Sequence, residues 1–274
     1  MTQYTARLTG VVPFNLQETF ECGQCFRWLP GDDGSYTGVV GQNVITLRAD
    51  GDDLLVAGLD QAEAEQRLIP YLALDEDYAA IQEQFRRNAQ LAQAVDYARG
   101  IRVLRQDEWE MLVSFIISQR KSIPAIRRAV ELLSERFGER LGSDSEGPVY
   151  AFPTAEALCC AGEQALQECG LGYRTRYVLH AAQQAAEGTL DLKKLASLPD
   201  EALFARLMEL DGVGKKVANC VCLFGYGRVG RVPVDVWIER LIRDEFAGQD
   251  PFPQFGLEAG IVQQYLFFYK RSVG

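Results

Sequence analysis

The sequence predicts an α+β protein in which an N-terminal antiparallel β-sheet packs on a larger helical part. Residues 36–57 alternate apolar and polar side chains with a period near two, which is typical of strands. After Gly100 the apolar residues recur instead at the three- and four-residue spacing of helices. The length of 274 residues fits one large domain or two ordinary ones. We therefore expect a β-rich domain over residues 1–99 and a helical domain over residues 100–274.

Three strands are predicted in the first part. Residues 36–40 and 43–48 are joined by Gly41-Gln42 as a tight turn, and a second turn at residues 50–53 leads into a strand at 54–57. From Gln61 onward the pattern becomes helical.

The sequence after Gly100 predicts a succession of helices with no internal repeat. Apolar stripes cover residues 109–117 and 123–137, and Pro153-Thr154 is typical of a capped helix start. Further helices are expected over residues 174–187, 200–211, 215–224, 236–246 and 257–272.

Composition excludes the membrane and exported classes. The longest apolar runs are far too short to cross a bilayer, and the first twenty residues lack the unbroken apolar core of a signal peptide. Seven cysteines, an odd number, indicate reduced thiols inside a cell. Cys22 and Cys25 have the spacing of a zinc or redox pair, but His180 is the only histidine and supplies no obvious complement. We expect most of these thiols to serve packing.

The net charge of −10 argues against a nucleic-acid partner without excluding one. Residues 1–100 hold 7 basic and 15 acidic side chains, a net of −8. Residues 101–200 hold 12 and 14, a net of −2, and residues 201–274 hold 9 and 9, a net of zero. Because the acidity is concentrated in the first third, a polyanion could still bind to the remainder.

The most informative segment is residues 207–218, where one helix runs into a Gly-x-Gly turn and a second helix begins at once. Gly212 and Gly214 allow a tight turn and a close approach of the backbone to a partner. The first N–H groups of the second helix are unpaired and form a natural seat for one phosphate, although a lone Gly-x-Gly often does no more than end a helix. Main-chain amides can bind phosphate even in an acidic protein.

Lys216 lies in the first turn of that second helix. An isolated lysine would be interpreted as a solvated surface residue. Here the positive end of the helix disfavours the ammonium form, and a neutral amine can act as a nucleophile that forms a Schiff base. Lys215 adds a like charge and is expected to contact phosphate or solvent.

Asp235 precedes a helical stripe and follows Pro233, which favours an extended approach. Aspartate is a favoured N-cap, and this one could serve only as a cap. No capping box supports it, because the third helical position is Ile238. A carboxylate at this place could also stabilise a cationic sugar opposite Lys216. The two roles are compatible.

The residues at 212–220, Gly-Val-Gly-Lys-Lys-Val-Ala-Asn-Cys, followed by Val-Pro-Val-Asp-Val at 232–236, resemble the helix-hairpin-helix DNA glycosylase superfamily, with the hairpin at about residues 200–225. More narrowly, the chain resembles the 8-oxoguanine DNA glycosylase branch. Further segments support the resemblance, namely residues 23–28 (Gly-Gln-Cys-Phe-Arg-Trp), 104–107 (Leu-Arg-Gln-Asp) and 170–177 (Gly-Leu-Gly-Tyr-Arg-Thr-Arg-Tyr). It covers about residues 20–270 and is weakest between 50 and 99.

The resemblance implies a lyase-type glycosylase that binds double-stranded DNA containing a damaged base. Lys216 is the implied nucleophile on the sugar C1′, and Asp235 is its acidic partner. The carbonyl of Gly23 would accept a hydrogen bond from the protonated N7 of 8-oxoguanine, whereas normal guanine carries a bare acceptor there. A simple turn glycine is the alternative for Gly23.

The rest of the base pocket and the DNA contacts are also implied by the resemblance. Gln263, Phe267 and Cys220 match pocket positions, and Cys220 with Phe267 would sandwich the extruded base. For Phe267 alone, core packing is the alternative. The residues expected to contact DNA are Arg120, Lys121, Tyr173, Arg174, Gly212, Gly214 and Lys215, with Tyr173 as the wedge. No cofactor is expected to be required, but a monovalent cation, K⁺ or Na⁺, would bind the carbonyls of Met208, Leu210 and Val213.

The sequence departs from the family pattern at three places. Arg120-Lys121 stands where the family has an asparagine pair, and Ala125 stands where it has an arginine. Trp237 replaces a histidine. The first two changes affect recognition of the base opposite the lesion, and the third affects a phosphate or pocket contact.

We therefore expect a bifunctional glycosylase and abasic-site lyase for 8-oxoguanine, an intracellular monomer without membrane contact, associated with the nucleoid if bacterial. Two alternatives remain open. One is an alkylated-purine glycosylase of the same fold, whose members generally lack the lysine. The other is a non-catalytic DNA-binding protein that uses the hairpin alone.

Overall fold

The computed structural model describes residues 2–143 and 147–273 and divides the chain into two compact units. One unit comprises the residues up to Gly38, Ile45–Arg105 and the segment from Gly227 onward. The other comprises Val39–Val44 and Gln106–Tyr226. The sequence-based division placed every helix after residue 100 in one domain, whereas the last two long helices pack within the unit that contains the N-terminal residues.

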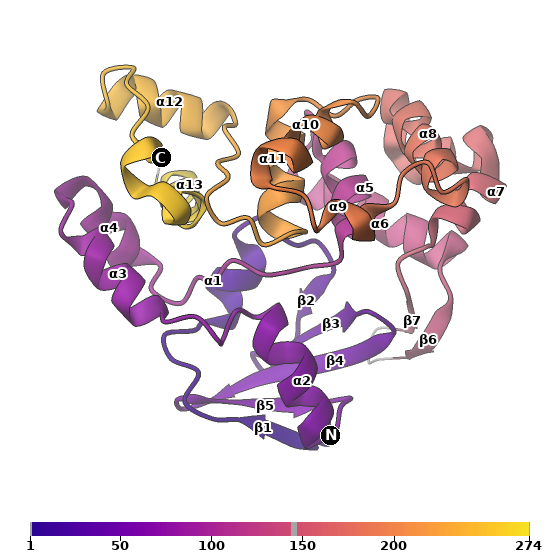
Figure 1. Ribbon diagram of the computed structural model, residues 1–274. Coiled ribbons are helices and arrows are strands. Elements are labelled where there is room, and N and C mark those ends of the chain that lie inside the picture. The colour runs from indigo at the N-terminus through magenta and orange to yellow at the C-terminus, as the bar shows by residue number, and fades with distance from the viewer. Residues whose placement is uncertain (1, 144–146, 274) are drawn as a thin grey trace. The chain divides into compact units, whose positions relative to one another are not determined.

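A five-stranded antiparallel sheet forms the N-terminal part, in the order β1-β5-β4-β3-β2 (Figure 1). Its strands are β1 (Ala6–Leu8), β2 (Trp28–Pro30), β3 (Tyr36–Val40), β4 (Asn43–Asp50) and β5 (Asp53–Ala57). The predicted alternation is confirmed on the two longest neighbours, where Ile45 and Leu47 of β4 and Leu54 and Val56 of β5 are buried. Gly41 makes the predicted tight turn with a φ of 61°.

Helices of the same unit come from both ends of the chain. They are α1 (Leu16–Glu21), α2 (Gln61–Tyr71), α3 (Tyr78–Arg86), α4 (Ala89–Tyr97), α12 (Val236–Glu245) and α13 (Ala259–Val273), with a 3₁₀ segment at Phe252–Glu258 before α13. Helix α2 begins at a capping box formed by Asp60 and Glu63. Helix α13 packs on α4, α12 and the 3₁₀ segment.

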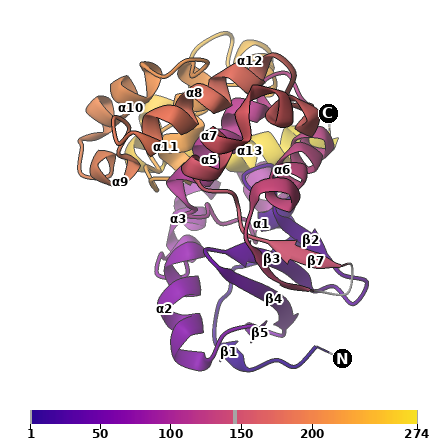
Figure 2. The ribbon, with the colours of Figure 1, turned by 90° about the vertical axis from the view of Figure 1, so that its right-hand side faces the viewer.

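The stretch Gln106–Tyr226 of the second unit is mainly helical and contains one short hairpin (Figure 2). Its helices are α5 (Glu108–Ser118), α6 (Ile123–Phe137), α7 (Ala155–Leu166), α8 (Thr175–Ala186), α9 (Leu192–Leu195), α10 (Asp200–Met208) and α11 (Lys215–Phe224), with short η1 (Gln167–Leu171) and η2 (Gly172–Arg174) before α8. Strands β6 (Arg140–Ser143) and β7 (Pro148–Tyr150) form the hairpin, which the sequence analysis did not predict. Gly138 permits it, because a β-carbon there would meet the carbonyl oxygen of Ala151.

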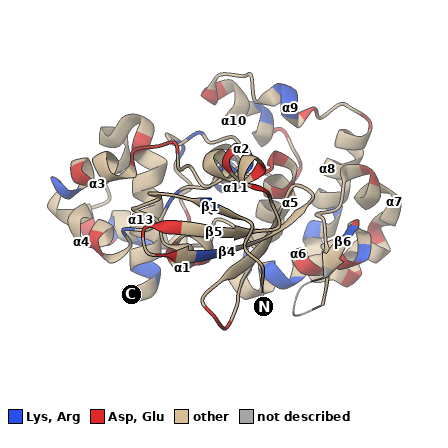
Figure 3. Ribbon diagram, turned by 90° about the horizontal axis from the view of Figure 1, so that it is seen from below, with Lys and Arg blue, Asp and Glu red and all other residues tan. Residues whose placement is uncertain are grey.

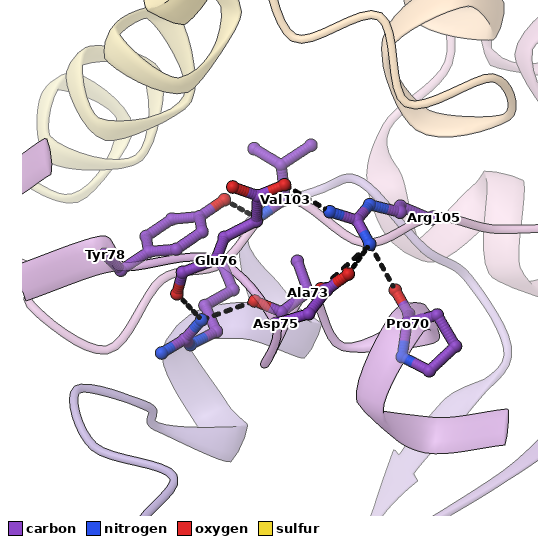
Figure 4. Close-up of polar contacts among 8 residues, drawn as sticks. Pro70, Ala73, Asp75, Glu76, Tyr78, Val103 and Arg105 are labelled. Carbon is purple, nitrogen blue, oxygen red and sulfur yellow. Dashed lines mark hydrogen bonds and ion pairs between the residues drawn. The ribbon is translucent and has the colours of Figure 1, made fainter. Parts of the chain in front are cut away.

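An extended segment leads from α4 to α5 and is pinned to the chain between α2 and α3 (Figure 4). The Arg105 guanidinium pairs with Asp75 and Glu76, and the N–H of Val103 donates to the Tyr78 hydroxyl at 2.8 Å. Burial raises the pKa of the Tyr78 hydroxyl to about 12, so the hydroxyl remains neutral.

Charged residues of both signs are scattered over the helices (Figure 3). Short helix α9 carries Lys193 and Lys194 in its last turn, whereas α5 carries Glu108 and Glu110 in its first turn. No helix in the described part of the chain is both long and apolar enough to span a bilayer.

Candidate active site

The turn between α10 and α11 has the geometry that the sequence predicts for binding a phosphate. Gly212 adopts a φ of +78°, and a β-carbon there would lie 2.4 Å from the ring of Tyr177, so only glycine fits. Gly214 is the N-cap of α11, and no side chain caps this helix. The first N–H groups of α11 are therefore available to an anion.

Gln119 ties this turn to the end of α5, a contact that the sequence analysis missed. Its Nε2 donates to the carbonyl of Gly212 at 2.9 Å and to the carbonyl of Ile116 at 3.0 Å. The only signal in the sequence is a glutamine directly after an apolar helix, which many surface residues share.

Lys216 lies in the first turn of α11 and is half-buried, whereas Lys215 is exposed. The Lys216 Nζ lies 5.1 Å from the ring centroid of Phe115, which stacks in turn on Phe224. Within the described residues of this unit, no carboxylate forms an ion pair with Lys216. An amine on an apolar wall, without a counter-ion beside it, is suited to nucleophilic chemistry.

Cys220 is buried and lies one helical turn after Lys216 on the same helix. The i, i+4 spacing places both side chains on one face of α11. The structure thus places Lys216 and Cys220 on one face of the helix that follows the Gly212–Gly214 turn, and their roles stay predictions.

A second group in this unit surrounds Tyr173, whose side chain is 50% exposed. Arg174 is buried, stacks on the Tyr173 ring at 4.3 Å and donates to the carbonyls of Leu171 and Gln119. The structure therefore makes Arg174 a support for the exposed tyrosine, and its direct DNA contact stays a prediction.

The two cations predicted at the start of α6 differ in their surroundings. The Lys121 Nζ donates to the carbonyl of Gly170 at 2.8 Å, and partial burial together with the nearby Arg174 lowers the pKa of Lys121. Arg120 is exposed and adopts a φ of +52°, which is uncommon for a side chain of this size. Arg120 forms no hydrogen bond or ion pair with the residues that the structure describes.

The remaining predicted residues lie in the unit that contains the sheet. Gly23 follows α1 with a φ of +84°, and its carbonyl accepts no hydrogen bond from the described residues. A carbonyl without a partner fits the predicted acceptor for a protonated base nitrogen.

Helix α13 supplies the other two predicted pocket residues. Gln263 is 3% exposed, and its Oε1 has no hydrogen-bond partner among the described residues. A buried, unsatisfied amide oxygen is costly unless a ligand completes it. Phe267 is half-buried one turn later, and the Arg271 guanidinium lies 5.5 Å from its ring centroid. Gln263 and Phe267 are four residues apart on α13, which is consistent with the prediction that they lie on one face of a helix.

Asp235 caps α12, as the sequence analysis expected. Its Oδ1 accepts hydrogen bonds from the N–H groups of Trp237 and Ile238, both at 3.0 Å. One carboxylate oxygen thus serves as the cap, and the predicted role of Asp235 in the chemistry stays a prediction. Trp237, which replaces the family's histidine, lies beside the Arg240 guanidinium at 5.5 Å.

The predicted cation ligands, Met208, Leu210 and Val213, flank the same turn as Gly212. The carbonyl of Leu210 accepts one hydrogen bond, from the N–H of Val213 at 3.0 Å, which leaves a second lone pair. No cluster of three metal-ligating side chains occurs in residues 2–143 and 147–273. No disulfide forms among the residues that the structure describes, and Cys22 and Cys25 are buried.

Comparison with known proteins gives two family matches that cover most of the chain. Residues 8–112 match the N-terminal domain of 8-oxoguanine DNA glycosylase, and residues 113–251 match the HhH-GPD superfamily of base excision DNA repair proteins.

One curated relative and two solved structures agree with these matches. The N-glycosylase/DNA lyase of Saccharomyces cerevisiae is 31% identical over 255 residues, which is 84% of this chain and 68% of that protein. MBOgg1, solved with a low-affinity DNA ligand, gives a TM-score of 0.93 at 36% identity over 98% of this chain and 96% of that chain. The 8-oxoguanine glycosylase/lyase of Clostridium acetobutylicum was solved with double-stranded DNA containing cytosine opposite 8-oxoG. It gives a TM-score of 0.89 at 33% identity over 94% of this chain and 92% of that chain.

Proposed function

The chain belongs to the HhH-GPD superfamily of base excision repair proteins, in its 8-oxoguanine DNA glycosylase branch, and from this premise we propose how its residues carry out the reaction. The protein is a bifunctional DNA glycosylase that excises 8-oxoguanine from duplex DNA and nicks the resulting abasic site. The observation that carries the assignment is a lysine that forms no ion pair with the described residues of its unit, one residue inside a helix whose first N–H groups are open to a phosphate.

Binding begins at the phosphate backbone and ends with the damaged nucleotide outside the duplex. The N–H groups at the start of α11, together with Gly212, Gly214 and Lys215, hold one phosphate. The sugar carbon of the lesion is unreachable inside the helix, so the nucleotide must be extruded. The exposed ring of Tyr173 fills the gap, held by the Arg174 guanidinium on its face.

The extruded base is recognised by a difference of one hydrogen atom. In 8-oxoguanine N7 carries a proton, which donates to the carbonyl of Gly23. Guanine has a bare N7 acceptor that faces the same oxygen and is repelled. The buried Oε1 of Gln263 accepts from a donor on the other edge of the base, which completes its hydrogen bonding. Phe267 and Cys220 pack against the faces of the base.

Lys216 performs the covalent chemistry. Its Nζ forms a bond to C1′ as the bond from C1′ to the base nitrogen breaks, and the base leaves with that electron pair and takes up a proton. The sugar ring opens to an imine between Nζ and C1′. Loss of a proton from C2′ then expels the 3′ phosphate by β-elimination, and water hydrolyses the imine to free the lysine.

Asp235 stabilises positive charge as it develops on the sugar. An anion fixed before the reaction is effective because it does not need to reorganise in the transition state. The two N–H bonds to its Oδ1 hold the carboxylate in one orientation. This second role is compatible with its role as the N-cap of α12.

A monovalent cation at the carbonyls of Met208, Leu210 and Val213 would draw the hairpin turn tight and add positive charge near the bound phosphate. The chemistry fits, because hard cations prefer oxygen ligands and the carbonyl of Leu210 has a lone pair to spare. We propose further that the protein acts as a monomer in the compartment that holds the chromosome, which is the nucleoid in a bacterium.

An incision assay on matched duplexes tests this function against its two alternatives. We expect strand cleavage of a duplex containing 8-oxoguanine opposite cytosine, and none of the same duplex with guanine. Release of 3-methyladenine without cleavage of the 8-oxoguanine duplex would establish the alkylated-purine alternative. Binding to both duplexes without any product would establish the non-catalytic one.

A further inference from the structure

Five successive backbone carbonyls, those of residues 19–23, lie at the end of α1. Side chains of residues 22–25, directly after the helix, donate hydrogen bonds to the first two. The carbonyl of Thr19 accepts from the Gln24 Nε2 at 2.9 Å and from the Cys22 thiol at 3.1 Å. The carbonyl of Phe20 accepts from the Cys25 thiol at 3.5 Å. The buried thiols of the Cys-x-x-Cys segment therefore act as hydrogen-bond donors to a helix end.

Side chains of helix α13 donate hydrogen bonds to the next two carbonyls. The carbonyl of Glu21 accepts from the Arg271 guanidinium, and the carbonyl of Cys22 accepts from the Gln264 Nε2 at 2.8 Å. Gln264 is 2% exposed, so this bond is shielded from water. The fifth carbonyl, that of Gly23, is the one left open among the described residues.

The peptide between Gly23 and Gln24 is also held in one orientation. The Gln24 Nε2 donates to the Cys22 sulfur at 3.2 Å, which ties the residue after Gly23 to the residue before it and restricts rotation of the peptide between them. Burial raises the pKa of the Cys22 thiol to about 11, so the sulfur remains a neutral thiol that both accepts this bond and donates to Thr19.

The Gln24 side chain extends the anchoring into the pinned segment before α5. It is fully buried, its Nε2 donates to the carbonyl of Arg102 at 2.8 Å, and its Oε1 accepts from the N–H of Leu104 at 2.8 Å. That segment is itself held by Tyr78 and Arg105 (Figure 4).

This fixation has a chemical consequence for selectivity. A glycine with φ near +84° can reorient its following peptide at little steric cost. If the peptide flipped, the N–H of Gln24 would replace the carbonyl of Gly23, and a donor in this place attracts the bare N7 of guanine. The distinction between lesion and normal base therefore depends on preventing the flip.

We propose that Gln264 and Arg271 are positioning residues that lock the Gly23 carbonyl as the acceptor for the lesion, and that they thereby set selectivity for oxidised over normal purine. The proposal rests on the function proposed above and extends it to two side chains on α13 that need not touch the DNA. It predicts a loss of base recognition without a loss of the lysine chemistry.

The experiment compares two reactions of the same enzyme under single-turnover conditions. Excision of 8-oxoguanine needs the carbonyl of Gly23, whereas nicking of a preformed abasic site needs Lys216 but no base. In Gln264→Leu, which removes the donor to Cys22, we expect excision to fall about tenfold while nicking stays within twofold, and guanine release to rise relative to 8-oxoguanine release.

Gln82→Leu is the matched control. Gln82 is also buried in this unit, and its Nε2 donates to the carbonyl of Arg99 and to the Tyr265 hydroxyl, away from Gly23. We expect this variant to lower the melting temperature but to keep the wild-type ratio of excision to nicking.

Three results would overturn the proposal. They are an unchanged ratio in Gln264→Leu, a parallel loss of both activities, and an equal change of the ratio in Gln82→Leu. If Gln264→Leu shows no cooperative melting, Arg271→Met is judged by the same ratio. A wild-type enzyme that nicks abasic sites but never releases 8-oxoguanine would overturn the proposed function itself, whereas a selective wild type with an equally selective Gln264→Leu overturns only the positioning role.

Discussion

The ring of Tyr177 packs directly on the α-carbon of Gly212, so that a β-carbon at position 212 would lie 2.4 Å from the ring. This contact joins α8 to the Gly212–Gly214 turn before α11. Tyr177 also meets Tyr173 edge-on, with 6.1 Å between the ring centroids. The proposed wedge and the proposed phosphate site are thus connected through the Tyr177 side chain.

The two glycines of the turn should differ sharply in their tolerance of alanine. Gly212→Ala meets the Tyr177 ring and a left-handed φ, and we expect it to destabilise the protein by about 1–3 kcal/mol and to weaken DNA binding. Gly214→Ala meets nothing within 4 Å at an ordinary φ, so its stability should stay within about 1 kcal/mol of wild type. Urea unfolding of both variants measures this, and equal losses would contradict the steric explanation.

Asp235→Asn should separate capping from chemistry. Asparagine caps a helix as well as aspartate does, so the melting temperature should change little. Loss of the negative charge should slow excision by about a hundredfold or more, because the developing sugar cation loses its counter-charge. Single-turnover rates within a few-fold of wild type would leave Asp235 with a structural role alone.

Discrimination for cytosine opposite the lesion should be less sharp than the family pattern implies. Reading the orphan base needs side chains at its edge, where a good bidentate pair contributes about 1–3 kcal/mol. Ala125 offers no donor, and the Arg174 guanidinium already donates to two backbone carbonyls. We expect excision opposite cytosine to lead excision opposite adenine, guanine or thymine by well under a hundredfold.

The interpretation of the measured preference for cytosine depends on the side chain of Arg120. It is exposed and carries five donors, which could reach the orphan base instead of a phosphate. A lead for cytosine of a hundredfold or more, abolished in Arg120→Ala, would contradict the prediction and identify Arg120 as the reader.

The buried thiol of Cys22 should make the protein sensitive to alkali. Its pKa is raised by burial from 9.0 to about 11, so the neutral thiol is favoured in the folded state. This shift of the Cys22 pKa contributes roughly 2–3 kcal/mol to the free energy of unfolding. The contribution is fully present below pH 9 and is lost as the pH rises through 11. The free energy of unfolding of wild type should therefore fall more steeply between pH 9 and 11 than that of Cys22→Ser, which keeps a hydroxyl donor that does not titrate there. Parallel curves would contradict the shift.

The regular elements could be predicted because their signals are local. The alternation over residues 36–57 and the apolar stripes after Gly100 depend on neighbours in sequence, and the structure confirms strands and helices there. Asp235 was predicted as a cap from its place before a helical stripe, and its two N–H bonds confirm that role.

The parts that could not be predicted depend on contacts between distant segments. Gln264 bonds to Cys22 across 242 positions, and nothing around either residue in the sequence indicates the other. The packing of α13 against α4 and the hydrogen bond from the Arg174 guanidinium to the carbonyl of Gln119 also join segments that are far apart in the sequence. The helix start after the Gly-x-Gly turn already indicated Lys216 and the resemblance supplied Gly23, but the hydrogen bonds around Gly23 are visible only in the structure.

The central claim is that Lys216 is the nucleophile, and trapping with borohydride tests it most directly. Reduction of the imine during reaction with an 8-oxoguanine duplex should crosslink wild-type protein to the DNA. We expect Lys216→Gln to bind the duplex but to give no crosslink, and Lys215→Gln to crosslink as wild type does. Full crosslinking by Lys216→Gln, or its loss only in Lys215→Gln, would contradict the account.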